Sequence, residues 1–368
     1  MNTETAKPAI SSLSDEDIRK ILNEDPVFIR EKSNPSPKKV VPYGGTGTVR
    51  IRDLTKTPAP TSPGSFVSGC LVAKSVNDWN EEASRRPAPR QLWNQLWFEG
   101  EICCLFADSN LGKSIMAVQI GENIAATQKV IYFDFEMLDK QFQLRYTNEE
   151  TGRTFAFNPN FMRATINRES TPDAEFEDYI MLSIESLSLQ VGAKVLIIDN
   201  LTFLCNGSES GDAAGVFMAS LMNLKRKHGW SILVISHTPK RDLTMPITQN
   251  DLAGSKRLFN FFDSVFTIGA SARDNALRYI KQLKARACPI EYDASNVMLC
   301  DIVMHESGFL HFRKIGFAPE QAHLKVKEGA QKDARALAAA LRQQGKTNRE
   351  IAVELGISER TVTRYLNH

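Results

Sequence analysis

The sequence has few of the features that mark exported, membrane-bound or metal-stabilised proteins. No apolar run approaches the roughly 20 residues of a membrane span, and the N-terminus carries Glu4 and Pro8 where a signal peptide has an apolar core. The six cysteines show neither a C-x-x-C pair nor another metal-ligand spacing. We therefore expect a cytoplasmic protein with reduced thiols, no structural zinc and no contact with a membrane.

Charge of one sign is also not in excess. The 45 Lys and Arg residues stand against 43 Asp and Glu residues, so the net charge is +2. This balance excludes a chain that is basic throughout but allows local basic patches. The 368 residues, of which 42% are hydrophobic, are enough for one large soluble core with appendages.

Proline separates the N-terminal part from the rest, because ten of the 16 prolines precede residue 90. Proline cannot donate to a strand ladder, and such segments bury little apolar surface. We predict a Pro-rich, largely disordered arm over 1–68, with one short helix at Asp15–Asn23 capped by Ser14. The arm is either a partner-docking peptide or a disordered leader.

The pattern over 69–316 predicts an α/β domain. Short continuous apolar runs alternate with amphipathic stretches, which is typical of a parallel sheet covered by helices on both faces. The predicted parallel strands are Ile102–Ala107, Val130–Phe135, Phe161–Ile166, Val195–Asp199 and Ile232–Ser236, and the helices are Lys113–Ala126, Ala174–Gln190 and Ala214–Lys227. The later runs Ser264–Ile268, Ala276–Arg286, Val297–His305 and Phe309–Lys314 follow one another without helices, so they predict antiparallel strands that extend the sheet.

A phosphate-binding loop is predicted at 107–114, where ADSNLGKS follows an apolar strand and opens a helix. Inward-facing backbone N–H groups and the positive end of the helix dipole both favour phosphate. Lys113 can reach the β and γ phosphates of ATP, and the Ser114 hydroxyl can bind Mg²⁺. The nucleotide-binding residues are predicted to be Ala107, Asp108, Ser109, Asn110, Leu111, Gly112, Lys113 and Ser114, with Ala107 in place of the usual first glycine.

Two carboxylates complete the predicted chemistry. Asp199 ends a buried aliphatic strand, at the edge where ligands bind in such sheets, so it is the predicted second Mg²⁺ ligand. Asn200 follows it, so no glutamate stands next to the metal aspartate. Glu136, after the second strand, is the predicted general base that activates water, and Asp134 is its rival.

These residues resemble the RecA-like hexameric ATPases, and in particular the plasmid RepA-type replicative helicases and related AAA-25 proteins of bacterial mobile elements. The resemblance covers about 90–302 and rests on ADSNLGKS, FDFEM, VLIIDN, ILVISHTPKR and YIKQLKARA. It implies that Glu136 is the catalytic base and His237 the γ-phosphate sensor. It also implies that Lys284 and Arg286 form a K-x-R pair inserted into the neighbouring subunit's site. Two such cations would stabilise the developing phosphoryl charge; a solvated basic strand edge is the alternative.

The resemblance places loops that bind single-stranded DNA after His237, where they line the channel of a ring. The Gly- and Ser-rich segment 205–215 is either a second channel loop or a long turn. Flexible cations there would follow a phosphodiester backbone without reading its sequence. The predicted DNA contacts are Lys240, Arg241, Lys256 and Arg257. No aromatic residue is available for base stacking before Phe259, and a solvated loop is the alternative.

The last part of the chain predicts a linker over 317–330 and a small all-α domain over 331–368. Its helices are predicted at Lys332–Gln343, from Thr347 to Gly356 with a capping box completed by Glu350, and from Ser358 to Leu366. The short turn between the last two helices is typical of a helix-turn-helix that binds duplex DNA. The predicted core is Leu337, Leu341, Ile351, Ala352, Leu355, Ile357, Val362 and Leu366, and the predicted DNA contacts are Arg360, Thr361, Thr363 and Arg364. A protein-docking bundle is the alternative.

Together these features predict an ATP-dependent DNA motor, a hexameric helicase that acts in replication, mobilisation or excision of a plasmid or mobile element. A primase or other replication or excision proteins would be its partners. The alternatives are a DNA-dependent ATPase switch or loader that does not unwind, and a DNA-binding regulator that nucleotide only stabilises. ATP turnover with and without single-stranded DNA separates the regulator from the other two.

Overall fold

The computed structural model describes residues 64–68, 71–167, 169, 176–201, 212–238, 241–252, 256–326 and 328–367. The chain divides into two compact units, Met1–Pro87 and Ala88–His368. In the first unit, β1 (Phe66–Ser68) pairs antiparallel with β2 (Leu71–Ala73), and α2 (Val76–Ser84) follows. The predicted helix at Asp15–Asn23 and residues 1–63 of the predicted arm lie outside the described residues.

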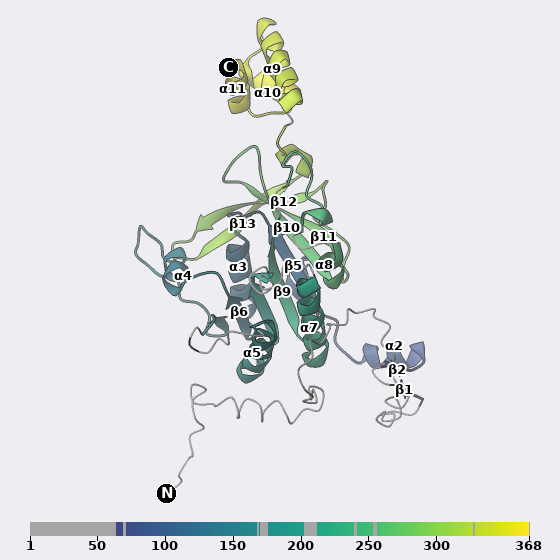
Figure 1. Cartoon of the computed structure of the whole chain (residues 1–368). Helices are drawn as coiled ribbons and strands as arrows, with labels where there is room; N and C mark the ends of the chain where they lie inside the picture. Colours follow the sequence, from purple (N-terminus) through teal and green to yellow (C-terminus); the bar gives the residue numbers. More distant parts are fainter. Residues whose placement is uncertain are drawn as a thin grey trace, which may run out of the picture. The chain divides into compact units, whose positions relative to one another are not determined.

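A nine-stranded sheet forms the centre of the second unit, in the order β13-β12-β11-β10-β5-β9-β8-β6-β7 (Figure 1). Six neighbouring strands run parallel: β10 (Ser264–Ala270), β5 (Ile102–Ala107), β9 (Ser231–His237), β8 (Val195–Asp199), β6 (Val130–Asp134) and β7 (Phe161–Ala164). Antiparallel strands β11 (Arg278–Lys284), β12 (Val297–Met304) and β13 (Leu310–Ala318) extend one edge. The predicted fold, a parallel sheet with an antiparallel extension, is confirmed.

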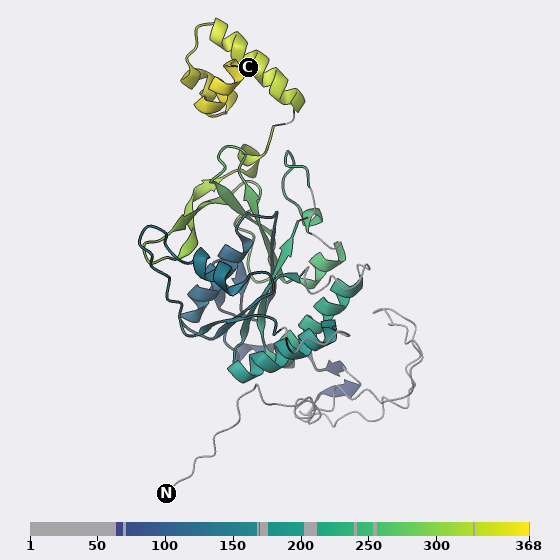
Figure 2. The same ribbon diagram turned by 60° about the vertical axis from the view of Figure 1, so that its left-hand side comes forward.

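Helices cover both faces of this sheet, as the view in Figure 2 shows. Alternate residues of β5 face opposite cores: Cys103 and Leu105 pack with α3 (Lys113–Ala125), whereas Cys104 and Phe106 belong to the core of the other face. That second core contains side chains of α5 (Phe176–Val191), α7 (Asp212–His228) and α8 (Lys256–Phe261). Burial on both faces explains why the parallel strands are continuously apolar. Short elements α4 (Asp139–Arg145), β3 (Gln91–Trp93), β4 (Trp97–Phe98) and η4 (Gln249–Asp251) complete the unit.

Part of the segment predicted as a linker belongs to the sheet and its packing. Strand β13 continues to Ala318, and the 3-10 turn η5 (Glu320–His323) follows it. Glu320 is fully buried and pairs with Lys281 of β11. The predicted start of the linker, at residue 317, was therefore wrong. The local sequence does not indicate that this segment is packed, because Lys281, the partner of Glu320, is distant in the sequence.

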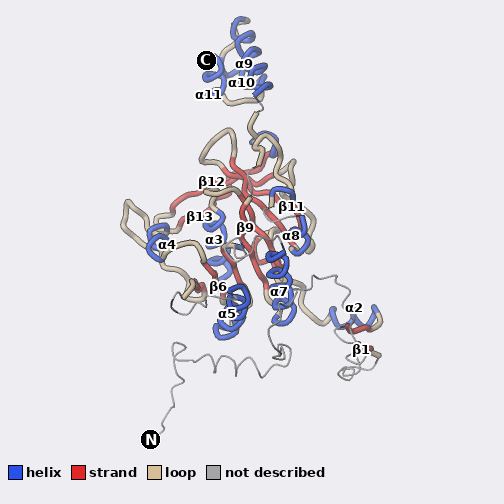
Figure 3. Tube along the Cα trace, in the orientation of Figure 1, coloured by secondary structure: helices blue, strands red, loops and turns tan. Residues whose placement is uncertain are grey.

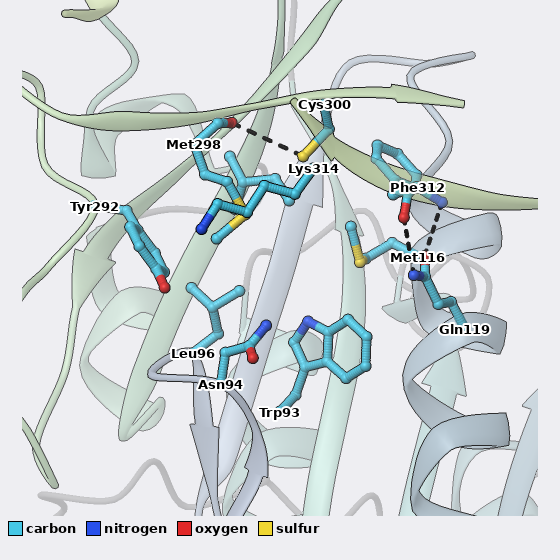
Figure 4. Close-up of a pocket in the computed structure, with 11 residues that line it drawn as sticks. Trp93, Asn94, Leu96, Met116, Gln119, Tyr292, Met298, Cys300, Phe312 and Lys314 are labelled. Carbon is cyan, nitrogen blue, oxygen red and sulfur yellow. Dashed lines mark hydrogen bonds between the residues drawn. The ribbon is translucent and has the colours of Figure 1, made fainter. Parts of the chain in front are cut away.

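A cavity of about 190 Å³ lies between α3 and the antiparallel strands (Figure 4). Gln119 of α3 is fixed beside it, because its side-chain amide donates to the carbonyl of Phe312 at 3.0 Å and accepts from the N–H of Phe312 at 2.8 Å. Met116, Trp93, Met298 and Cys300 also line the cavity. None of the lining residues belongs to 107–114, so the cavity is separate from the predicted phosphate-binding loop.

Gly269 of β10 faces the ring of Tyr279 on β11. A Cβ at this glycine would lie 2.1 Å from Cζ of Tyr279, and the ring itself is fully buried. We expect Gly269→Ala to lower the free energy of unfolding by about 1–3 kcal/mol and the melting temperature by roughly 5 °C. Thermal unfolding of the full chain measures this. The matched control is Gly316→Ala in β13, where no atom lies within 4 Å of the added Cβ; equal melting temperatures for the two variants would contradict the packing argument.

The C-terminal residues form three helices, α9 (Glu328–Gln343), α10 (Asn348–Leu355) and α11 (Glu359–Leu366), drawn in blue in Figure 3. The predicted caps are confirmed: Thr347 and Glu350 form a capping box, Ser358 accepts from the N–H of Thr361, and Gly356 ends α10 with φ +62°. The buried core consists of Ala338, Leu341, Ile351, Ala352, Val362 and Tyr365.

The prediction that Leu337 belongs to the core of this domain is wrong. Leu337 is 50% exposed, whereas its neighbour Ala338 is fully buried. The face of α9 that packs is therefore shifted by one residue, and Tyr365 of α11 supplies the bulk that Leu337 was expected to provide. Within the part of the chain that the structure describes, no helix has the length and apolar character needed to traverse a bilayer.

Candidate nucleotide-binding site

Four neighbouring parallel strands bring their carboxyl ends to one edge of the sheet. Ala107, the last residue of β5, is level with His237, the last residue of β9. Asp134 and Asp199 are likewise level at the ends of β6 and β8. Because ligands of open parallel sheets bind beyond this edge, the polar residues that follow these strands are the candidate site.

The loop that follows β5, which is the predicted phosphate-binding loop, contains two residues with left-handed backbone. Asn110 and Gly112 have φ values of +63° and +93°, in the left-handed region. Gly112 also lies under the antiparallel strands, since a Cβ there would be 2.8 Å from Cδ1 of Ile302. Helix α3 begins at Lys113, so its positive end points toward the loop.

Lys113 is held inside this loop. Its ammonium group donates to the carbonyls of Ala107 at 2.9 Å and Asp108 at 3.0 Å, and the residue is only 7% exposed. Burial lowers the pKa of Lys113, while the nearby carboxylates of Asp199 and Glu136 oppose that shift. Phosphate oxygens are stronger acceptors for an ammonium group than peptide carbonyls, so Lys113 is placed to exchange these carbonyls for a phosphate.

Asp199 and Ser114 fit the requirements of a magnesium ion. Asp199 is 2% exposed, and it accepts hydrogen bonds from Ser114 and from the Tyr132 hydroxyl, the latter at 2.7 Å. Burial raises the pKa of Asp199 to about 6, which a bound cation would reverse. Carboxylate and hydroxyl oxygens are hard ligands of the kind Mg²⁺ prefers, and phosphates commonly supply the others. Among the described residues, no three His, Cys, Asp or Glu side chains come together as a metal site of their own.

Glu136, Asn200 and His237 meet beside this carboxylate. The side-chain amide of Asn200 hydrogen-bonds to Oε1 of Glu136 and lies 3.0 Å from Nε2 of His237. His237 Nε2 is in turn 3.3 Å from Oε1 of Glu136. The hydrogen bond with His237 is the main cause that lowers the pKa of Glu136, although partial burial opposes it. Glu136 is thus an ionised carboxylate at neutral pH, as a general base must be.

The contacts of Asp134, the alternative candidate for the general base, indicate a structural role. Its carboxylate accepts from the backbone N–H groups of Glu136 at 3.1 Å and Met137 at 2.9 Å. Arg163 of β7 donates to it from Nε at 2.9 Å and also binds the carbonyl of Met137. These bonds occupy the Asp134 oxygens and shape the turn that carries Glu136.

Lys284 and Arg286 lie toward the opposite side of the sheet from the candidate site, where the parallel strands begin. Lys284 is paired with Val265 near the start of β10, whereas Ala107 is level with Ile268, so the two positions differ by about 10 Å along the strands. Lys284 donates to the carbonyl of Phe259 at 3.1 Å, and burial lowers its pKa. Arg286 is paired with Asp263 at 2.8 Å, and its side chain is 61% exposed. Neither cation belongs to the phosphate site of its own chain.

The predicted DNA-binding cations differ in their surroundings. Lys240 lies outside the described residues, as do the side chains of Lys256 and Arg257 at the start of α8 and residues 205–211 of the second predicted loop. Arg241 is not an exposed loop cation: its side chain is 7% exposed and faces Asp108 of the phosphate loop. Phe259, considered for base stacking, is 8% exposed and belongs to the core.

In the C-terminal domain, the four predicted contacts divide into two kinds. Arg360 and Arg364 are exposed on α11. Thr361 shares a hydrogen bond with Ser358 at 2.9 Å, and Thr363 donates to the Glu359 carbonyl at 3.0 Å. The two arginines are therefore better placed than the threonines to reach a phosphate backbone.

Sequence reasoning missed three residues of the site. Asn200 was noted only because it is not a glutamate, yet it joins Glu136 to His237. Tyr132 and Arg163 orient Asp199 and Asp134. The signal for Asn200 was its position one residue beyond a buried strand, which places it at the same edge as the other polar groups; no local pattern marks Tyr132 or Arg163.

Comparison with known proteins finds family matches for two segments of the chain. Residues 71–242 match a family model described as an AAA domain, and residues 330–368 match one described as a homeodomain-like domain. Among solved structures, a KaiC-like protein from the archaeon Pyrococcus horikoshii OT3 is similar, with 12% identity over 59% of this chain and 91% of that chain and a TM-score of 0.44. No curated protein matches the sequence. The first match covers less than half of the chain and ends before Lys284 and Arg286, and the second lies over the three C-terminal helices.

Proposed function

We propose that this protein is an ATP-driven DNA motor, a hexameric ring helicase that serves the replication, mobilisation or excision of a plasmid or mobile element. The observation that carries the proposal is the arrangement of Glu136, Asn200 and His237 beside the phosphate loop. A protein that only binds nucleotide has no need of an oriented, ionised carboxylate at that place.

The residues of one chain would act in sequence on a bound triphosphate. Lys113 leaves the two loop carbonyls and binds the β and γ phosphates, while Ser114 and Asp199 hold Mg²⁺. When bound, Mg²⁺ offsets negative charge on the phosphates. Glu136 then takes a proton from the attacking water. His237 contacts the same carboxylate, so it can report the presence of the γ phosphate to β9.

A neighbouring chain would complete the site. Lys284 and Arg286 are remote from the phosphate loop of their own chain, and Arg286 is exposed and held by a single carboxylate, that of Asp263, among the described residues. Asp263 would keep the ammonium group of Lys225 as a partner, at 2.7 Å, so the exposed guanidinium of Arg286 can exchange Asp263 for a phosphate. Hydrolysis that needs this exchange would depend on closure of the ring.

ATP turnover with and without single-stranded DNA tests the proposed function, together with strand displacement on a forked duplex. A motor requires both DNA-stimulated turnover and displacement. Stimulated turnover without displacement would favour a switch or loader, and absence of turnover would favour a DNA-binding regulator. Electron microscopy with an ATP analogue and DNA would reveal ring closure.

Binding of duplex DNA by the C-terminal domain should depend on its exposed arginines. We expect the double substitution Arg360→Ala and Arg364→Ala to weaken binding of a mixed-sequence duplex by roughly 10- to 100-fold. The salt dependence should lose a slope of about one per cation, because each arginine releases counterions from phosphate. Fluorescence anisotropy at several salt concentrations measures both effects.

The matched control is Arg342→Ala, since Arg342 is exposed on α9 and bonds the Lys346 carbonyl. It should leave duplex binding unchanged. If the double variant bound duplex as tightly as the unaltered protein, α11 would not be the recognition helix, and the domain would instead be a protein-docking bundle.

A further inference from the structure

Arg241 was expected to contact DNA, but its surroundings point to another role. Its Nε lies 3.7 Å from Oδ2 of Asp108, and Nη1 donates to the carbonyl of Met245 at 3.0 Å. Only 7% of the side chain is exposed. Burying a guanidinium is unfavourable unless it is paired and hydrogen-bonded, so the fold holds this cation against the phosphate loop instead of offering it to solvent.

Residues far along the chain fix the segment that carries Arg241. Tyr279 of β11 hydrogen-bonds to Arg241, and its hydroxyl donates to Oε1 of Glu320 at 3.2 Å. Glu320 also accepts from the N–H of Ile247 at 2.8 Å, and Lys281 donates to the carbonyl of Ile247 at 2.7 Å. Both backbone groups of Ile247 are thereby bound.

Lys325 holds the same segment through a second backbone contact, in which its N–H donates to the carbonyl of Leu243 at 3.1 Å. With bonds at Leu243 and Ile247, the backbone just after Arg241 has little freedom to move. The guanidinium is therefore positioned by the antiparallel strands and by η5, independently of any DNA.

The charge of Asp108 connects this contact to nucleotide binding. Asp108 belongs to the loop that must accept a triphosphate, and a carboxylate there repels phosphate oxygens unless a cation neutralises it. Arg241 is the cation that pairs with the Asp108 carboxylate among the described residues, since Lys113 bonds the backbone carbonyl of Asp108 and not its side chain.

We propose that Arg241 is a positioning residue of the nucleotide site, which neutralises Asp108 and so allows the phosphate loop to accept a nucleoside triphosphate. The proposal rests on nucleotide binding as part of the proposed function, but not on hydrolysis, DNA binding or ring assembly. It makes a prediction of sign: removing the cation weakens nucleotide binding, and also removing the anion restores it.

The test uses the full-length chain and a fluorescent ATP analogue with Mg²⁺. We expect Arg241→Gln to weaken binding about 10-fold at low salt, and less at high salt because screening reduces the repulsion. Asp108→Asn is measured alone as the reference, and the double variant should bind at least about threefold more tightly than Arg241→Gln. Arg241→Lys, which keeps the charge, should lose less than Arg241→Gln. Arg313→Ala removes an exposed arginine paired with Asp301 and is the matched control.

Each other outcome overturns part of the assignment. If the double variant bound as weakly as Arg241→Gln, Arg241 would only support the fold, and if Arg241→Gln lowered affinity for single-stranded DNA alone, it would be a DNA contact. Unaltered protein that bound nucleotide without turnover would end the proposed motor function and leave this inference standing. Unaltered protein that bound no nucleotide would end both.

Discussion

Chains that carry Glu136→Gln should bind ATP and Mg²⁺ but turn ATP over roughly 100- to 10,000-fold more slowly, which is the usual contribution of a general base. Glutamine keeps the shape of the side chain and can still accept the hydrogen bond from Asn200. It cannot take a proton from water. DNA-stimulated phosphate release measures the loss, and binding of a fluorescent ATP analogue measures what is retained.

Glu149→Gln is the matched control, because Glu149 is exposed near the turn after α4 and away from the strand ends. It should leave turnover unchanged. Asp134→Asn should instead lower stability, since Asp134 accepts two backbone N–H groups and Arg163. Turnover by Glu136→Gln near that of the unaltered protein would show that another group activates the water.

Chains with Lys113→Ala and chains with Arg286→Ala should each be nearly inactive, with a loss on the order of 1,000-fold for the arginine, yet a mixture of the two should regain activity. Lys113 acts on the nucleotide of its own chain, whereas Arg286 is remote from that site and is proposed to act on a neighbour's. Random mixing pairs an intact loop with an intact arginine at about a quarter of the interfaces of a head-to-tail ring. Phosphate release from equimolar mixtures, after subunit exchange, measures the recovery.

Arg313→Ala chains control for the loss of an exposed, paired arginine and should be fully active alone. Two results would contradict the arrangement between chains: a mixture no more active than its components, or a protein that stays monomeric with ATP and DNA while hydrolysing at full rate. Either would leave Glu136 as the base and remove the need for a ring.

The fold was predictable because its elements are strongly patterned. The strands Ile102–Ala107 and Val195–Asp199 have the predicted bounds, because each is an apolar run that stops at an aspartate. Asp108 follows the first strand, and Asp199 is the last residue of the second. The caps Thr347 and Ser358 were equally local signals. In each case the physical cause lies within a few residues of the feature.

What was missed depends on contacts between distant segments. From the sequence alone, Arg241 is predicted to be a loop cation. Its contact with Tyr279, which in turn bonds to Glu320, depends on the antiparallel strands that extend the sheet. The choice between Leu337 and Ala338 depends on where α11 packs against α9, and an amphipathic helix alone tolerates either. The role of Asn200 required the ends of β6, β8 and β9 to be adjacent, which topology decides and sequence spacing does not.

The bonds from Glu320 and Lys325 to the segment after Arg241 have a mechanical consequence. Both residues lie shortly before α9, in the part of the chain that leads to the helices proposed to bind duplex DNA. A load on that duplex would pass along the chain through these two residues to the ATPase domain. Load on the duplex would in this way weaken the contact between Arg241 and Asp108 and lower the affinity for nucleotide.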